Sequence, residues 1–183
     1  AKSIQNEQAV LAQKRTERDK DTKEVIVPHQ VDAISIEIGY GLIGIADETK
    51  DENIMNQVLI IRKQFAQELG LLLGPIRIRD NLQLEMNKYA IKIKGNTQAK
   101  GNLYMDKELM LLPDGQDVTF KGIPAKEPAF GLDALWIESS DREMAEINDF
   151  TVVDPLTVLV THLKETIRLN SYSLLGCQEV KQL

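Results

Sequence analysis

The sequence predicts an α+β fold in two small lobes, with a mixed or antiparallel sheet accompanied by helices. Three observations support this fold class. Isoleucines alternate with polar residues over 34–38, which indicates a half-buried strand. Apolar residues recur every three or four positions over 54–69, which indicates an amphipathic helix. A section rich in proline, glycine and acids over 113–150 marks a second lobe, and 183 residues leave room for two small domains.

The first lobe begins near Val31, and a turn at 39–41 follows its first strand. The helix over 54–69 starts at a polar capping residue and is closed by Gly70. The candidates for its N-cap are Asp47, Thr49 and Asp51. The apolar stripe that would face the core consists of Ile54, Val58, Ile61, Phe65 and Leu69.

Two or three antiparallel strands come next, at 76–79, 82–86 and 89–94, and 103–112 offers a further one. In the second lobe, 140–147 is expected to form a short helix with Ser139 or Ser140 as its cap.

A strand at 151–153 then leads into the last helix. Asp154 supplies its capping carboxylate, and Pro155 suits the first helical position, where no backbone donor is needed. We expect this helix to pack back on the first lobe, because its apolar positions form one stripe. These positions are Leu156, Leu159, Val160, Leu163 and Ile167.

Composition narrows the classes of function. A net charge of -6 argues against nonspecific nucleic-acid binding, which needs an excess of bases, so proteins are the expected partners. The single cysteine, Cys177, cannot form an internal disulfide and suits the cytosol. No run of 18 apolar residues and no signal-peptide core occur, so we expect a soluble, excised fragment. Residues 1–30 are mostly polar and read as a flexible linker, ordered only against a partner.

The spacing Gly39-x-Gly41-x-x-Gly44 matches the dinucleotide-binding fingerprint. In that fingerprint a helix begins within the glycine turn, so that its amide groups meet the pyrophosphate. Here a mainly acidic stretch, 47–52, follows the turn and would repel phosphate. A turn that joins two strands is therefore favoured, and a small nucleotide-binding domain is the alternative function.

Catalytic chemistry has few candidate residues. His162 is the one histidine in the folded part, and neither a serine nor a cysteine has an evident base. We expect His162 to be a packed or surface residue of its helix. Arg77 and Arg79 are expected to pair with carboxylates rather than with nucleic acid. We predict no enzyme activity and no cofactor. We also predict no metal site, since no cysteine pair or spaced histidine pair occurs.

The segment 127–138 fits neither helical nor strand periodicity and holds the only tryptophan. Two outcomes are open for its large apolar residues, which are Phe130, Leu132, Leu135 and Trp136. They fill the core of the small lobe, or they leave an apolar dimple between the lobes.

At this point the sequence resembles the cytoplasmic part of the FHIPEP family, the export-gate proteins of flagellar and type III secretion systems. The resemblance covers Val31 to the end. It rests on segments in order at 36–43, 61–70, 77–81, 92–95, 127–132, 135–137, 151–155 and 161–163. The segments 39–43 and 151–155 favour the flagellar branch.

The resemblance implies a platform for protein export rather than an enzyme. It divides the chain into a linker at 1–30, a first subdomain at 31–105 plus 155–174, an inserted second subdomain at 106–154 and the start of a third at 175–183. Family members carry arginine at the position of Cys177. The location would be the cytoplasmic face of the bacterial inner membrane.

The implied partners are flagellar export chaperones with bound cargo, other export-apparatus proteins and, in the whole protein, eight further copies that complete a nonameric ring. The chaperone-docking dimple of the family matches Glu127, Phe130 and Thr161, with Pro128, Val153 and Val158 as lining. Glu127 and Thr161 would set the polar contacts at its rim.

Overall fold

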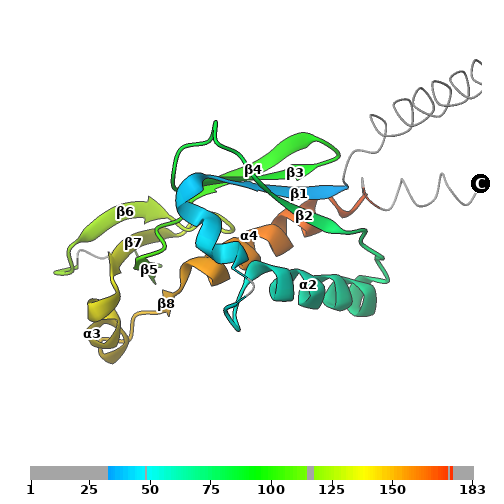
Figure 1. The fold of residues 1–183 in the computed structure, drawn as a ribbon. Coiled ribbons are helices and arrows are strands. Elements are labelled where there is room, and N and C mark those ends of the chain that lie inside the picture. Colours follow the sequence, from blue (N-terminus) through cyan, green and yellow to red (C-terminus); the bar gives the residue numbers. More distant parts are fainter. Residues whose placement is uncertain (1–32, 48, 115–117, 173, 175–183) are drawn as a thin grey trace, which may run out of the picture. The chain divides into compact units, whose positions relative to one another are not determined.

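The computed structural model describes residues 33–47, 49–114, 118–172 and 174 (Figure 1). The linker predicted for 1–30 and the third subdomain predicted from 175, with Cys177, lie outside the described residues. The described part holds two four-stranded sheets and several helices, so the α+β fold class is confirmed. The subdomain boundaries stay a prediction.

The first sheet is mixed, with strand order β2-β1-β3-β4. β1 (Ile34–Ile38) pairs in parallel with β2 (Ile76–Asp80) and antiparallel with β3 (Lys88–Ile93). The sequence-based expectation of antiparallel strands after the first helix was wrong for β2. The helix α2 (Ile54–Leu69) connects β1 to β2 as a crossover, which returns the chain to the same end of the sheet.

β4 (Asn96–Asn102) was not predicted from the sequence, because its residues are almost all polar. It pairs antiparallel with β3 after a turn at Lys94 and Gly95, both of which have positive φ. The strand offered at 82–86 was wrong. Leu82 and Met86 are exposed there, and the chain runs through turns.

α2 buries the expected apolar stripe except for Leu69, which is exposed. Its N-cap is Asn53, whose side-chain oxygen accepts a bond from the Asn56 N–H at 3.1 Å, so the three predicted capping residues were wrong. Its end at Gly70 is confirmed, and that glycine has the left-handed conformation with φ 63°.

The second sheet is antiparallel throughout, with order β6-β7-β5-β8. Its strands are β5 (Lys107–Leu111), β6 (Gly122–Lys126), β7 (Asp133–Glu138) and β8 (Val152–Val153). The absence of periodicity in the segment 127–138 has a physical reason. β7 is a central strand with both faces buried, so its apolar residues do not alternate with polar ones. A 3₁₀ turn at Ser139–Asp141 and α3 (Arg142–Ile147) follow, without a side-chain cap.

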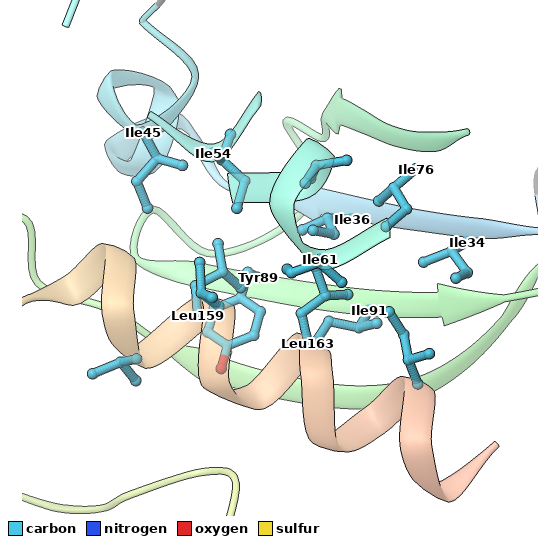
Figure 2. Packing of buried hydrophobic residues seen from close by; sticks show 14 of the residues in the cluster. Ile34, Ile36, Ile45, Ile54, Ile61, Ile76, Tyr89, Ile91, Leu159 and Leu163 are labelled. Carbon is cyan, nitrogen blue, oxygen red and sulfur yellow. The ribbon is translucent and has the colours of Figure 1, made fainter. Parts of the chain in front are cut away.

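α4 (Pro155–Leu169) begins as predicted. The Asp154 carboxylate accepts a bond from the Thr157 N–H at 3.3 Å, and Pro155 occupies the first turn. Figure 2 shows Leu159 and Leu163 of α4 lying near Tyr89 and Ile91 of the first sheet. The predicted packing of this helix on the first sheet is confirmed, since all four belong to one buried cluster.

Both sheets contribute to this main core. Leu109 and Trp136 of the second sheet are in the same buried cluster as the isoleucines of β1. The opposite face of β7 packs on α3 in a smaller cluster of Met110, Leu135, Ile137, Ala145 and Val152. Of the four apolar residues of the segment 127–138, Leu135 fills the core of the second sheet and Trp136 lies in the main core. Phe130 and Leu132 are exposed, so the expectation that all four fill the small core was wrong for them.

Candidate binding site

Glu127 organises the loop that joins β6 to β7. Its carboxylate accepts bonds from the Ala129 N–H at 2.9 Å and from the Phe130 N–H at 2.8 Å. Its main chain closes the same loop, because its carbonyl accepts from the Gly131 N–H at 2.8 Å. Glu127 is only 6% exposed. Both oxygens thus face the turn, so this side chain shapes the loop from inside.

Phe130 is the part of this loop that meets solvent. Its side chain is 62% exposed, which is unusual for a phenylalanine. Gly131 follows with φ 72°, a conformation that other residues rarely adopt, and turns the chain back towards β7. Pro128 is half buried and removes one backbone donor from the loop. The loop therefore presents one aromatic ring on a frame that Glu127 holds.

The remaining predicted site residues lie on β8 and α4. Val153 pairs with Leu109 in the second sheet and is half buried. Val158 is 2% exposed and belongs to the main core, as a support rather than a free surface. Thr161 lies one turn further along α4 on the same side, is half buried, and donates its hydroxyl to the Thr157 carbonyl at 2.8 Å.

A buried polar group that the sequence did not reveal lies between β3 and α4. The Tyr89 hydroxyl is 2.5 Å from Nδ1 of His162, and the two rings pack edge to face. Burial lowers the pKa of His162, while the negative charge of Glu127 acts in the opposite direction. Burial raises the pKa of Tyr89, and the negative charge of Glu127 raises it further. Pro128 of the Glu127 loop lines a hollow together with residues of β4, so the loop lies beside the first sheet.

The first two glycines of the turn at 39–44 are packed against another segment of the chain. A Cβ added at Gly39 would lie 2.1 Å from the Glu85 carbonyl oxygen, and one at Gly41 would lie 2.8 Å from the Met86 side chain. The glycines are thus required by a crossing segment of the same chain. The turn does not join two strands; it leads from β1 into a 3₁₀ helix, Tyr40–Ala46. Nothing in this arrangement supports the nucleotide-binding alternative.

A second surface feature lies between the two sheets. Residues of β4 and β6, together with Pro128, line a hollow of about 340 Å³ whose floor includes Tyr104 and Trp136. Sequence patterns singled out Trp136 but not this hollow, because neither β4 nor β6 was recognised as a strand. Among the described residues, no group of three or more His, Cys, Asp or Glu side chains is arranged to hold a metal ion.

The fold is shared with several solved structures. The Chlamydia pneumoniae CdsV protein matches 84% of this chain and 45% of its own with a TM-score of 0.68 and 22% identity. The CdsV and CdsO complex of the same organism matches 82% of this chain and 48% of that chain, with a TM-score of 0.66 and 21% identity. The nonameric EscV cytosolic domain of a type III secretion system matches 82% of this chain and 43% of its own, with a TM-score of 0.51 and 15% identity. At these identities the likeness concerns the fold.

Sequence similarity identifies the family. The model of the FHIPEP family matches residues 1–183, and the chain belongs to this family. The flagellar biosynthesis protein FlhA of Bacillus subtilis is 42% identical over 164 residues, which is 90% of this chain and 24% of the relative. FlhA of Salmonella typhimurium is 41% identical over 152 residues, which is 83% of this chain and 22% of the relative. The chain thus spans about a quarter of the length of these relatives. The resemblance inferred from the ordered segments is confirmed.

Proposed function

We propose that this chain is part of the platform of a flagellar type III export gate, where it docks chaperone–substrate complexes for secretion. Membership of the FHIPEP family and the flagellar relatives support the export-gate role. The observation that carries the docking role is the exposed Phe130 ring on a loop whose backbone is fixed by Glu127. A rigidly held aromatic side chain binds a partner with little loss of side-chain entropy.

The centre of the contact between the chaperone and this chain is apolar. An apolar side chain of the chaperone packs against Phe130, and the ring gains burial that the isolated chain does not give it. Pro128 and Thr161 border the contact, while Val153 and Val158 support it from the sheet and the helix. The Glu127 carboxylate acts through the loop, since both of its oxygens already accept main-chain bonds.

The remaining parts of the proposal concern assembly and place. The protein acts by binding rather than by catalysis. Nine copies of the whole protein form a ring at the cytoplasmic face of the inner membrane, and this ring binds other export-apparatus proteins. The solved EscV cytosolic domain is nonameric, which supports the ring and the location. The complex of CdsV with CdsO supports binding to other proteins of the apparatus. No helix of the described residues is long and apolar enough to cross a membrane.

Calorimetric titration with a flagellar export chaperone bound to its cargo tests the docking role. Phe130→Ala should weaken binding by about 1 to 4 kcal/mol, as truncation of a central aromatic contact does. Leu59→Ala is the matched control, because Leu59 is an apolar residue of α2 that is 61% exposed. Equal affinity of Phe130→Ala and the native chain would rule out docking at Phe130. Equal losses in both variants would indicate nonspecific apolar contact.

A further inference from the structure

The two sheets of the described residues have four edge strands, and β4 is the longest of them. An edge strand presents main-chain donors and acceptors that no neighbouring strand uses. β8 has only two residues, whereas β4 has seven. β4 is therefore the edge best suited to receive another extended segment.

The register shows which main-chain groups of β4 face outwards. The Leu103 N–H donates to the Asn87 carbonyl, so Asn87 and Leu103 form a hydrogen-bonded pair. In an antiparallel ladder such pairs alternate, and Gly101, opposite Tyr89, is the next one. The N–H and C=O groups of Lys100 and Asn102 then point away from β3, towards the open edge.

β6, on the other side of the hollow, is less suited to strand pairing. The Glu127 N–H donates to the Leu132 carbonyl, which sets the alternation between β6 and β7. In this alternation the main chain of Pro124 faces outwards, away from β7. Proline has no N–H, so this position cannot donate to an added strand. An added strand would thus pair with β4, and it would meet β6 only through side chains such as that of Ile123.

The hollow between these two edges matches a polypeptide in size and charge. Its volume of about 340 Å³ lies within the range of ligand sites. Two lysines, Lys100 and Lys126, line it, and none of the described lining residues is acidic. Lys126 also pairs with Asp133, which holds it at the rim. Tyr104 and Trp136 stack edge to face in the floor.

We propose that the groove between β4 and β6 binds an extended, acidic segment of a partner protein by adding a strand to β4. Main-chain bonds to Lys100 and Asn102 supply the pairing, and the lysines select carboxylates. An edge lysine also discourages unwanted pairing of like strands, which fits selection by charge. This surface shares Pro128 with the border of the proposed chaperone contact, but Phe130 does not line the hollow and strand pairing to β4 does not require it.

Nuclear magnetic resonance of the 183-residue chain tests the proposal. The probe is a nine-residue capped peptide in which glutamate alternates with valine and threonine, and its counterpart has lysine in place of each glutamate. The acidic peptide should shift the amide signals of Lys100 and Asn102 and slow their hydrogen exchange. The basic peptide should do neither, because the groove is lined by positive charge.

Three variants complete the experiment. Lys100→Pro removes an outward N–H without removing a bond to β3, so the strand remains and the peptide effect should be lost. Lys63→Glu, on the exposed side of α2, is a charge-matched control for Lys100→Glu, and only the latter should lose binding. Phe130→Ala should bind the acidic peptide like the native chain.

Several results would overturn the proposal. One is the absence of any change at Lys100 and Asn102 at millimolar acidic peptide. Another is a set of shifts spread over many lysines without slower exchange in β4, which indicates charge attraction alone. A third is slow exchange at these two amides that needs no peptide and increases with protein concentration, since it would assign the edge to a second copy of the chain.

Discussion

The hydroxyl of Tyr89 meets Nδ1 of His162 at 2.5 Å, although 73 positions separate the two residues. Burial raises the pKa of Tyr89, so the phenol keeps its proton at neutral pH. Burial also lowers the pKa of His162, which favours the neutral imidazole. The hydrogen bond between the hydroxyl and Nδ1 joins β3 of the first sheet to α4.

Stability should decrease below about pH 6.5, the ordinary pKa of histidine. The folded pKa of His162 is lowered, so the unfolded chain binds a proton at a higher pH than the folded chain does. The contribution of this histidine is complete above its unfolded pKa, and it is lost as the pH falls towards the folded value. Urea unfolding of the native chain and of His162→Phe at pH 7.5 and 5.5 measures it. His162→Phe should be less stable than the native chain at both pH values, but its stability should fall less between pH 7.5 and 5.5. Equal losses would contradict the assignment.

Glu127→Ala should lower the free energy of unfolding by about 1 to 3 kcal/mol, because the partly buried N–H groups of Ala129 and Phe130 would lose their acceptor. Chemical denaturation gives this difference directly. Glu68→Ala, at an exposed position of α2, should stay within about 0.5 kcal/mol of the native chain. Glu127→Ala should also weaken chaperone binding, whereas Phe130→Ala should weaken binding without the loss of stability. Full stability of Glu127→Ala would mean that the loop does not depend on this carboxylate.

Gly39→Ala should destabilise the chain by about 1 to 3 kcal/mol, since the new methyl group would overlap the main chain at Glu85. Thermal unfolding followed by circular dichroism provides the test. Gly74→Ala is the control, because nothing lies within 4 Å of a Cβ at that position. Similar melting temperatures for both variants would contradict tight packing at the glycine turn.

Asp154→Ala should cost about 0.5 to 2 kcal/mol through loss of the cap of α4. Asp141→Ala is the matched comparison, because Asp141 precedes α3 and makes no capping bond. The two variants can be compared by urea denaturation. Equal effects would show that helix capping does not explain the role of Asp154.

Sequence patterns predicted the elements whose two faces differ. The isoleucines of β1 and the apolar stripes of α2 and α4 face the core, and all three elements are confirmed. In β1 the intervening Ser35 is buried as well. The cap at Asp154 followed from local chemistry alone. The parallel placement of β2 did not, because it depends on the path of the crossover rather than on any residue of the strand.

The missed elements lack such a contrast. β4 has almost no large apolar side chain, β7 is buried on both faces, and β6 carries a proline that only an edge strand accepts. The site residues came from ordered segments shared with a family. Their pattern could not show that Glu127 is turned inwards, since this depends on bonds to Ala129 and Phe130 that form only in the folded loop.

The long span between Tyr89 and His162 has a consequence during synthesis. The first sheet buries residues such as Ile91 against α4, but α4 leaves the ribosome only after the whole second sheet has been made. Until then the face of β3 that α4 covers is open to water and to other nascent chains. Closure over 73 positions is also slow in comparison with local contacts. Early pairing within the second sheet shortens the free part of this loop, so it speeds the arrival of α4 and limits the time in which aggregation competes.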